Sequence, residues 1–180
     1  MLNRREFLSV GAVPLAAVAA AGTDRDAGGL PLARARDRST RQVGGTVRVG
    51  LIGAGANVQE VQIPGFRRIS GCEIVAVANR SLSSSQGVAD TFGIPRAYAH
   101  WGELLEDEDV DAVLIGTWPY MHRTITLAAL ERGKHVLCQA RMANTAGEAR
   151  EMLDASQRHP DLICQLVPTS TSYTIDNVLK

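Results

Sequence analysis

Short apolar runs alternate with amphipathic stretches from residue 47 to residue 167. Six of these runs are nearly continuous in Val, Ile, Leu and Ala, which is typical of strands buried on both faces of a parallel sheet. We therefore expect strands at 47–52, 73–79, 97–99, 112–116, 135–138 and 162–167.

The stretches between the runs have helical periodicity and recognisable ends. Gly93 and Gly133 follow two of them, at the position where glycine ends helices. We expect helices at 58–69 (kinked or broken at Pro64-Gly65), 83–92, 101–106, 121–132 and 145–158. The alternation of strands and helices predicts right-handed crossovers and a doubly wound α/β fold, with six parallel strands in the order 3-2-1-4-5-6.

The segment before residue 47 lacks this pattern. Arg4-Arg5 precedes Phe7-Leu8 and an apolar stretch rich in small residues. Such a start is typical of an export signal, and its paired arginines resemble the twin-arginine type. We expect residues 1–22 to be this signal, read by the twin-arginine export machinery, and residues 23–46 to be a flexible linker. The protein would then be periplasmic or extracellular; the alternative is the amphipathic start of a cytosolic protein.

The first apolar run of the domain leads directly into a glycine turn, Gly53-Ala54-Gly55. Gly53 permits a tight turn, Gly55 lets a phosphate approach the backbone, and the next helix begins with free N–H groups. Ala56 and Asn57 begin that helix, and we expect Asn57 to cap it or to face a phosphate. Val58 stands where a third glycine is usual, which predicts a slightly wider helix–strand spacing. The turn predicts a dinucleotide site.

The second run ends in Asn79-Arg80-Ser81. An acidic residue near this point would bind the ribose hydroxyls of NAD, and none is present. We expect Asn79 to bond a ribose hydroxyl, whereas Arg80 and Ser81 suit a 2′-phosphate. The cofactor is therefore predicted to be NADP or NAD. Our hypothesis is that the site prefers NADP. The alternative is that Arg80 is a solvated loop residue.

Two further strand ends fall at the same edge of the predicted sheet. Thr117 and Trp118 follow the fourth run, and we expect them beside the nicotinamide half of the cofactor. His122 is expected to face the cleft from the first turn of the next helix, and Gln139 to bond the nicotinamide ribose. The alternatives are a capping or packing role for His122 and a packing role for Trp118.

Composition narrows the function classes. The 19 basic and 19 acidic residues give a formal net charge of zero, and hence no electrostatic reason to expect nucleic acid as a partner. The three cysteines, Cys72, Cys138 and Cys164, lack metal-ligand spacing. We therefore expect neither a disulfide scaffold nor a metal site.

Several of these pieces together resemble the N-terminal cofactor domain of the Gfo/Idh/MocA oxidoreductases. They are the glycine turn, the segments 74–80, 111–115 and 133–138, and Thr117-x-Pro119 with His122. The resemblance implies a Rossmann fold, a sugar or cyclitol substrate, and oligomerisation through a C-terminal substrate domain. Because the chain stops at residue 180, we expect that second α/β domain to be absent, residues 169–180 to be its truncated connection, and the chain alone to have little or no activity.

The fifth run ends differently from the family pattern. The family usually has Glu-Lys-Pro there, with the lysine in the proton-handling site, whereas this chain has Gln139-Ala140-Arg141. Ala140 cannot exchange a proton, and an arginine that stays protonated is a poor general acid or base. The catalytic residue is thus unassigned. Besides an exported dehydrogenase, an NAD-dependent glycoside hydrolase and a non-catalytic nucleotide-binding module remain open.

Overall fold

The structure, a computed structural model, describes residues 45–167. The predicted signal at 1–22 and the predicted connection at 169–180 lie outside the described residues, as does nearly all of the predicted linker. Between residues 45 and 167, no helix combines the length and the apolar character that crossing a membrane requires.

Six parallel strands form a single sheet in the order β3-β2-β1-β4-β5-β6. This confirms the predicted doubly wound α/β fold and its strand order. The strands are β1 (Val47–Ile52), β2 (Cys72–Ala78), β3 (Arg96–Tyr98), β4 (Ala112–Ile115), β5 (His135–Cys138) and β6 (Cys164–Leu166). The bounds differ from the predicted ones only near their ends. The clearest case is β6, which begins late because the Leu162 N–H donates to the carbonyl of His159 in a turn.

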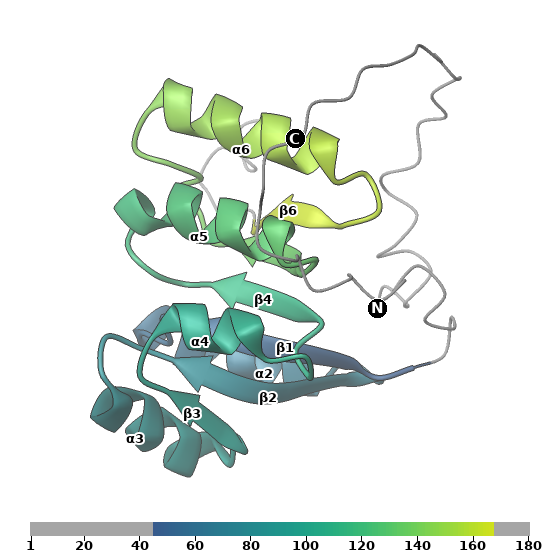
Figure 1. The fold of residues 1–180 in the computed structure, drawn as a ribbon. Coiled ribbons are helices and arrows are strands. Elements are labelled where there is room, and N and C mark those ends of the chain that lie inside the picture. Colours follow the sequence, from purple (N-terminus) through teal and green to yellow (C-terminus); the bar gives the residue numbers. More distant parts are fainter. Residues whose placement is uncertain (1–44, 168–180) are drawn as a thin grey trace, which may run out of the picture. The chain divides into compact units, whose positions relative to one another are not determined.

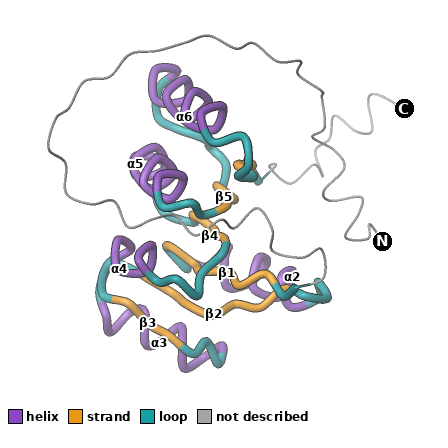
Figure 2. Tube along the Cα trace, turned by 45° about the vertical axis from the view of Figure 1, so that its right-hand side comes forward, coloured by secondary structure: helices purple, strands orange, loops and turns teal. Residues whose placement is uncertain are grey.

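Helices cover both faces of the sheet. They are α2 (Ile63–Arg67), α3 (Leu82–Phe92), α4 (Trp101–Glu106), α5 (Pro119–Glu131) and α6 (Ala146–Arg158), with a π-helical turn η1 (Val58–Gln62) before α2. Residues of α4, α5 and α6 share one apolar cluster with the sheet, and residues of η1, α2 and α3 share the other. Figure 1 and Figure 2 show α5 and α6 side by side, with α5 next to β4.

The central strands send alternate side chains into the two clusters. Ile52 and Ile115 pack with α4, α5 and α6, whereas Leu51 and Leu114 pack on the opposite face. All four side chains are almost completely buried. The continuous apolar runs of the sequence therefore reflect strands covered on both faces, as predicted.

The helix expected at 58–69 is divided at a proline. Proline has no N–H, and in an α-helix its ring crowds the carbonyl four residues earlier. The turn before Pro64 is widened, because the Ile63 N–H donates to the carbonyl of Val58, five residues back. The change of pitch thus falls directly before Pro64, where the sequence predicted a break.

Ion pairs connect the amino ends of the strands. Arg48 pairs with Asp111 and Asp109, and Arg96 lies 3.1 Å from carboxylate oxygens of both Asp107 and Asp109. The two arginines hold the pKa of Asp109 below its usual range. The opposite, carboxyl edge of the sheet carries the predicted site.

Candidate functional site

The glycine turn after β1 requires glycine at its first position. Gly53 has a φ of 83°, and a Cβ there would lie 2.8 Å from the Thr117 nitrogen. A Cβ at Gly55, in contrast, would meet nothing within 4 Å, and this residue is exposed. The turn is therefore closed toward the sheet and open at Gly55, which suits the approach of a phosphate.

Val58 makes a close contact in place of the missing third glycine. Its side chain is buried, and a Cβ at Gly116, directly after β4, would lie 2.5 Å from Val58 Cγ2. The same Cβ would lie 2.6 Å from the carbonyl oxygen of Gly53. The sequence predicted a wider spacing at Val58; the structure shows that the absence of a Cβ at Gly116, directly after β4, leaves room for the Val58 side chain. One sequence carries no signal that links these two positions.

Asn57 does not cap the helix, so that part of the prediction is wrong. Its backbone is already helical, with φ −59° and ψ −40°, and its side chain makes no capping bond. The helical turn begins earlier, since the carbonyl of Gly55 accepts from the Gln59 N–H at 3.0 Å. Asn57 Oδ1 instead accepts from Gln139 Nε2 at 3.2 Å, so the two side chains connect the glycine turn with the end of β5. Ala56, beside it, is exposed.

Asn79 is held within the protein, whereas the sequence predicted a bond to ribose. Its Oδ1 accepts from the Ala54 N–H at 2.7 Å, and its Nδ2 lies 3.2 Å from the carbonyl oxygen of Ser84. Its backbone N–H donates to Ser85 Oγ at 2.8 Å. Sequence reasoning missed Ser85, a completely buried serine. Its spacing from Val88 and Ala89, on the apolar face of α3, was the available signal.

Arg80 and Ser81 lie at the exposed start of α3. Ser81 caps this helix, because its Oγ accepts from the Ser84 N–H at 3.3 Å. Arg80 is exposed and forms no hydrogen bond or ion pair with any other residue between 45 and 167. Arg80 thus adds an exposed positive charge to a helix N-terminus at the carboxyl edge of the sheet.

His122 is completely buried, so the expectation that it faces the cleft is wrong. Its Nδ1 lies 2.8 Å from the carbonyl oxygen of Arg141, and its Nε2 lies 2.9 Å from that of Thr117. The ring therefore connects the loops that follow β4 and β5 from inside the protein. This is the packing role that the sequence left as an alternative.

Three other predicted residues lie at the carboxyl edge. Trp118 is 73% exposed and precedes α5, and Tyr120 beside it is 63% exposed. Thr117 is half-buried, as is Gln139, whose backbone N–H donates to the carbonyl of Ile115 at 2.9 Å. These side chains extend the edge from the glycine turn toward β5.

The end of β5 provides no reactive thiol. Burial, with a smaller contribution from the nearby Cys164, raises the pKa of Cys138 to about 12. Since the thiolate is the nucleophilic form, Cys138 stays inert at neutral pH. The next residue but one, Ala140, carries no proton-exchanging group, so no catalytic residue is assigned at this edge.

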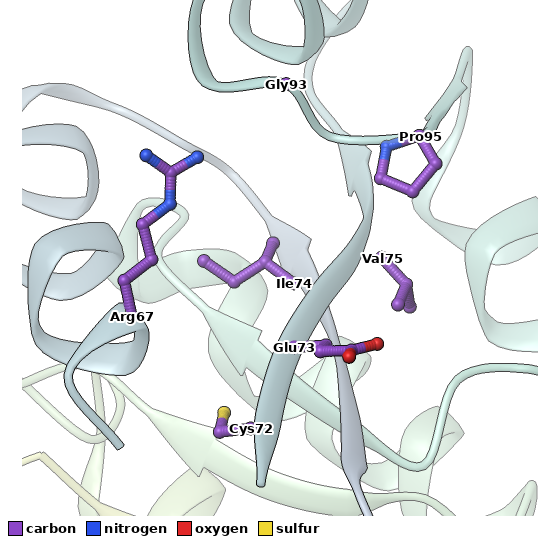
Figure 3. Close-up of a pocket in the computed structure, with 7 residues that line it drawn as sticks. All are labelled: Arg67, Cys72, Glu73, Ile74, Val75, Gly93 and Pro95. Atoms are coloured by element: carbon purple, nitrogen blue, oxygen red, sulfur yellow. The ribbon is translucent and has the colours of Figure 1, made fainter. Parts of the chain in front are cut away.

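A separate hollow lies at the other end of β2 (Figure 3). It has a volume of about 310 Å³ and is lined by Arg67, Cys72, Glu73, Ile74, Val75, Gly93 and Pro95. The Arg67 guanidinium donates to the carbonyl of Phe92 and lies 5.8 Å from the centre of the aromatic ring of the same residue. The hollow is at the amino end of β2 and is distinct from the carboxyl-edge site.

Comparison with known proteins places this domain among oxidoreductases. The model of the oxidoreductase family with an NAD-binding Rossmann fold matches residues 47–166. A 1,5-anhydro-D-fructose reductase from Ensifer adhaerens is 41% identical over 110 residues, 61% of this chain and 33% of the relative. An inositol 2-dehydrogenase/D-chiro-inositol 3-dehydrogenase from Shouchella clausii is 36% identical over 122 residues, 67% of this chain and 35% of the relative.

A solved structure extends the likeness to three dimensions. Biliverdin reductase from Synechocystis, in complex with biliverdin and NADP+, is 30% identical with a TM-score of 0.61. The match covers 67% of this chain and 37% of that one. The chain thus spans about a third of the length of the curated relatives it matches.

Proposed function

Because the chain belongs to the Gfo/Idh/MocA oxidoreductase family, which has an NAD-binding Rossmann fold, we propose that it is the cofactor domain of an exported dehydrogenase. This enzyme transfers hydride between a nicotinamide cofactor and a hydroxyl carbon of a sugar or cyclitol. The observation that carries the proposal is the open turn at Gly55, set between β1 and β4 where the strand order reverses. The bound cofactor supplies the hydride chemistry, and the protein supplies position and electrostatics.

Different residues at the carboxyl edge would bind different parts of the cofactor. The backbone at Gly53-Ala54-Gly55 and the helix start at Ala56 and Asn57 would hold the pyrophosphate. Thr117, Trp118 and Gln139 would lie along the nicotinamide half. His122 acts on this half only through the two loops it connects.

The substrate class is supported by the relatives and by the exposed aromatic side chains. Two relatives are named for anhydrofructose and inositol, which are small polyhydroxylated rings. Trp118 and Tyr120 are exposed beside the proposed nicotinamide position, and such faces stack well against the C–H groups of a sugar ring. A second domain would complete the substrate site and the oligomer.

A preference for NADP follows from the charge at the adenosine end. Arg80 and the start of α3 would bind a 2′-phosphate by charge-assisted bonds, and no carboxylate follows β2 to favour the 2′-hydroxyl of NAD. Calorimetric titration of the 180-residue chain is expected to show NADP+ binding at least about tenfold more tightly than NAD+. The R80A substitution should remove that difference and leave NAD+ binding unchanged; equal affinities in the wild type would reject the preference.

We propose that the protein is exported, because its sequence begins with a pair of arginines of the twin-arginine type. In cells that express the chain, the mature protein is expected in the periplasmic fraction, and substitution of Arg4-Arg5 by two lysines should retain it in the cytoplasm. Retention of the wild type inside the cell would reject this part of the proposal without touching cofactor binding.

A non-catalytic nucleotide-binding module is the second candidate, and Ala140 favours it. The dehydrogenase and the non-catalytic module can be distinguished with a fusion of this chain to the substrate domain of a family member. Reduction of NADP+ by free sugars supports the dehydrogenase, whereas tight cofactor binding without turnover supports the module.

A further inference from the structure

Asn79 joins the glycine turn to the first turn of α3. The ladder between β1 and β2 ends where the Gly53 N–H donates to the carbonyl of Ala78 at 2.8 Å. One residue further, the Ala54 N–H donates to the side-chain oxygen of Asn79 at 2.7 Å. The side chain of Asn79 thus supplies an acceptor to the backbone directly after the ladder ends. Ala54 is buried, so its N–H needs such an acceptor.

The other half of the amide is equally engaged. Asn79 Nδ2 lies 3.2 Å from the carbonyl oxygen of Ser84 and 3.3 Å from its hydroxyl. The site therefore demands an acceptor toward Ala54 and a donor toward Ser84, and a side-chain amide has both. A carboxylate would satisfy Ala54 but place a charged oxygen against the Ser84 carbonyl. An apolar side chain would leave the Ala54 N–H without its partner.

Both ends of the amide are already bound inside the protein, since Oδ1 accepts from the Ala54 N–H and Nδ2 donates to Ser84. Arg80 next to it is exposed at the start of α3. We propose that Asn79 is a positioning residue: it fixes the Gly53–Gly55 turn and, by withholding an acceptor from the ribose, leaves recognition of the 2′ position to Arg80. The inference rests on the proposed binding of NADP at this edge.

Two substitutions in the full chain test the positioning role. With N79A, the dissociation constants of NADP+ and NAD+ should rise by a similar factor, about tenfold, since the turn serves the pyrophosphate common to both. Amide hydrogen exchange at Ala54 should become faster. With N79D, repulsion from the Ser84 carbonyl turns the carboxylate toward the ribose, so the affinity ratio should move toward NAD+ by about tenfold or more.

Q86A is the matched control, because Gln86 is exposed on the same helix and its side chain bonds to Asp90, away from the glycine turn. It should leave the affinities and Ala54 exchange unchanged. If Asn79 bound ribose directly, N79A would weaken NAD+ more than NADP+ while Ala54 exchange stayed at the wild-type rate. That result would overturn the proposal.

The wild-type protein gives a test that needs no variant to fold. When NADP+ saturates the site, the side-chain amide protons of Asn79 should exchange as slowly as in the unliganded protein. Rapid exchange would reject the proposal that Ala54 and Ser84 hold this amide. Failure of the NADP preference has a different signature: equal NADP+ and NAD+ affinities, with N79A still accelerating exchange at Ala54. R80A, in turn, should change the affinity ratio and leave Ala54 exchange as it is.

Discussion

His122 shows how one side chain can organise a site without touching a ligand. Both of its ring nitrogens face backbone carbonyl oxygens, and the ring is completely buried. Phenylalanine has a similar shape but no donor, so H122F should lower the free energy of unfolding by about 1–3 kcal/mol, the cost of a buried carbonyl left without its hydrogen bond. Urea unfolding followed by circular dichroism measures this loss.

Thr124 provides the control for that substitution, because it is exposed on the same helix. T124A should change the free energy of unfolding by no more than about 0.5 kcal/mol. If H122F proved as stable as the wild type, the ring would act by packing alone.

A second residue-scale prediction concerns Gly116 and Val58. A Cβ at Gly116 would meet both Val58 Cγ2 and the Gly53 oxygen at less than 3 Å. G116A should therefore lower the free energy of unfolding by about 1–3 kcal/mol through overpacking. Because V58A removes one of the two clashes, the double variant should lose less stability than the sum of the single ones. Strictly additive losses in this cycle would show that the two side chains do not compete for space.

These residues also mark what one sequence can reveal. The glycine turn and the strand end at Asn79 were recognisable, because each residue type has a known use at the end of a buried strand. The partners were not. Whether Asn79 turns toward ribose or toward Ala54 depends on which backbone group lacks a partner, and that is decided by the register of β1 against β2. Asn57 is of a type that suits a helix cap, yet the helix begins before it.

At the scale of elements, α3 contains a residue that destabilises helices. Gly87 lies in the middle of this helix, and a Cβ there would meet nothing within 4 Å, so alanine should fit without strain. G87A is expected to raise the free energy of unfolding by about 0.5–1 kcal/mol, since alanine loses less backbone entropy than glycine in a helix.

Gly93, which ends the same helix, is the matched comparison. Its φ of 61° is left-handed, so G93A should lower the free energy of unfolding by roughly 1 kcal/mol, although its surroundings are equally open. Thermal unfolding of the two variants measures both effects. Equal effects of the same sign would contradict the assignment of helix interior and helix end.

The elements were the most predictable part of the fold. Buried strands in a parallel sheet carry continuous apolar runs, and glycine at 93 and 133 marked two helix ends correctly. For η1, the sequence predicted where the helix would be disturbed. It did not predict that the disturbance would be a π-helical turn. The proline requires some change in hydrogen bonding, and the residues at the two ends of the widened turn, Val58 and Ile63, are both buried in the core.

At the scale of the whole molecule, the two edges of the sheet have different roles. The amino edge is joined by Arg48, Arg96 and the aspartates at 107, 109 and 111, far from the carboxyl ends of the strands. The carboxyl edge exposes Gly55, Arg80 and Trp118. The ion pairs thus lie at one edge, whereas the other edge carries an open turn and an exposed cation, which suits ligand binding at the ends of parallel strands.

Alkaline stability tests the core of this arrangement through Cys138. The thiol ionises near pH 9 in the unfolded chain, but burial raises its pKa to about 12 in the folded one. Between these values the unfolded state loses a proton that the folded state keeps. The free energy of unfolding should therefore fall as the pH rises from about 9 toward 12, by up to about 1.4 kcal/mol per pH unit for this one group.

Urea unfolding in the presence of a reducing agent, at a series of pH values from neutral to alkaline, measures this slope. C138A should lower stability at neutral pH, because it leaves a small cavity, yet flatten the alkaline decline. Burial also raises the pKa of Cys72, Cys164 and Tyr98, so part of the decline should remain in the variant. A decline as steep in C138A as in the wild type would mean that the Cys138 thiol reaches solvent, and that the end of β5 is less tightly closed beneath the site than the structure shows.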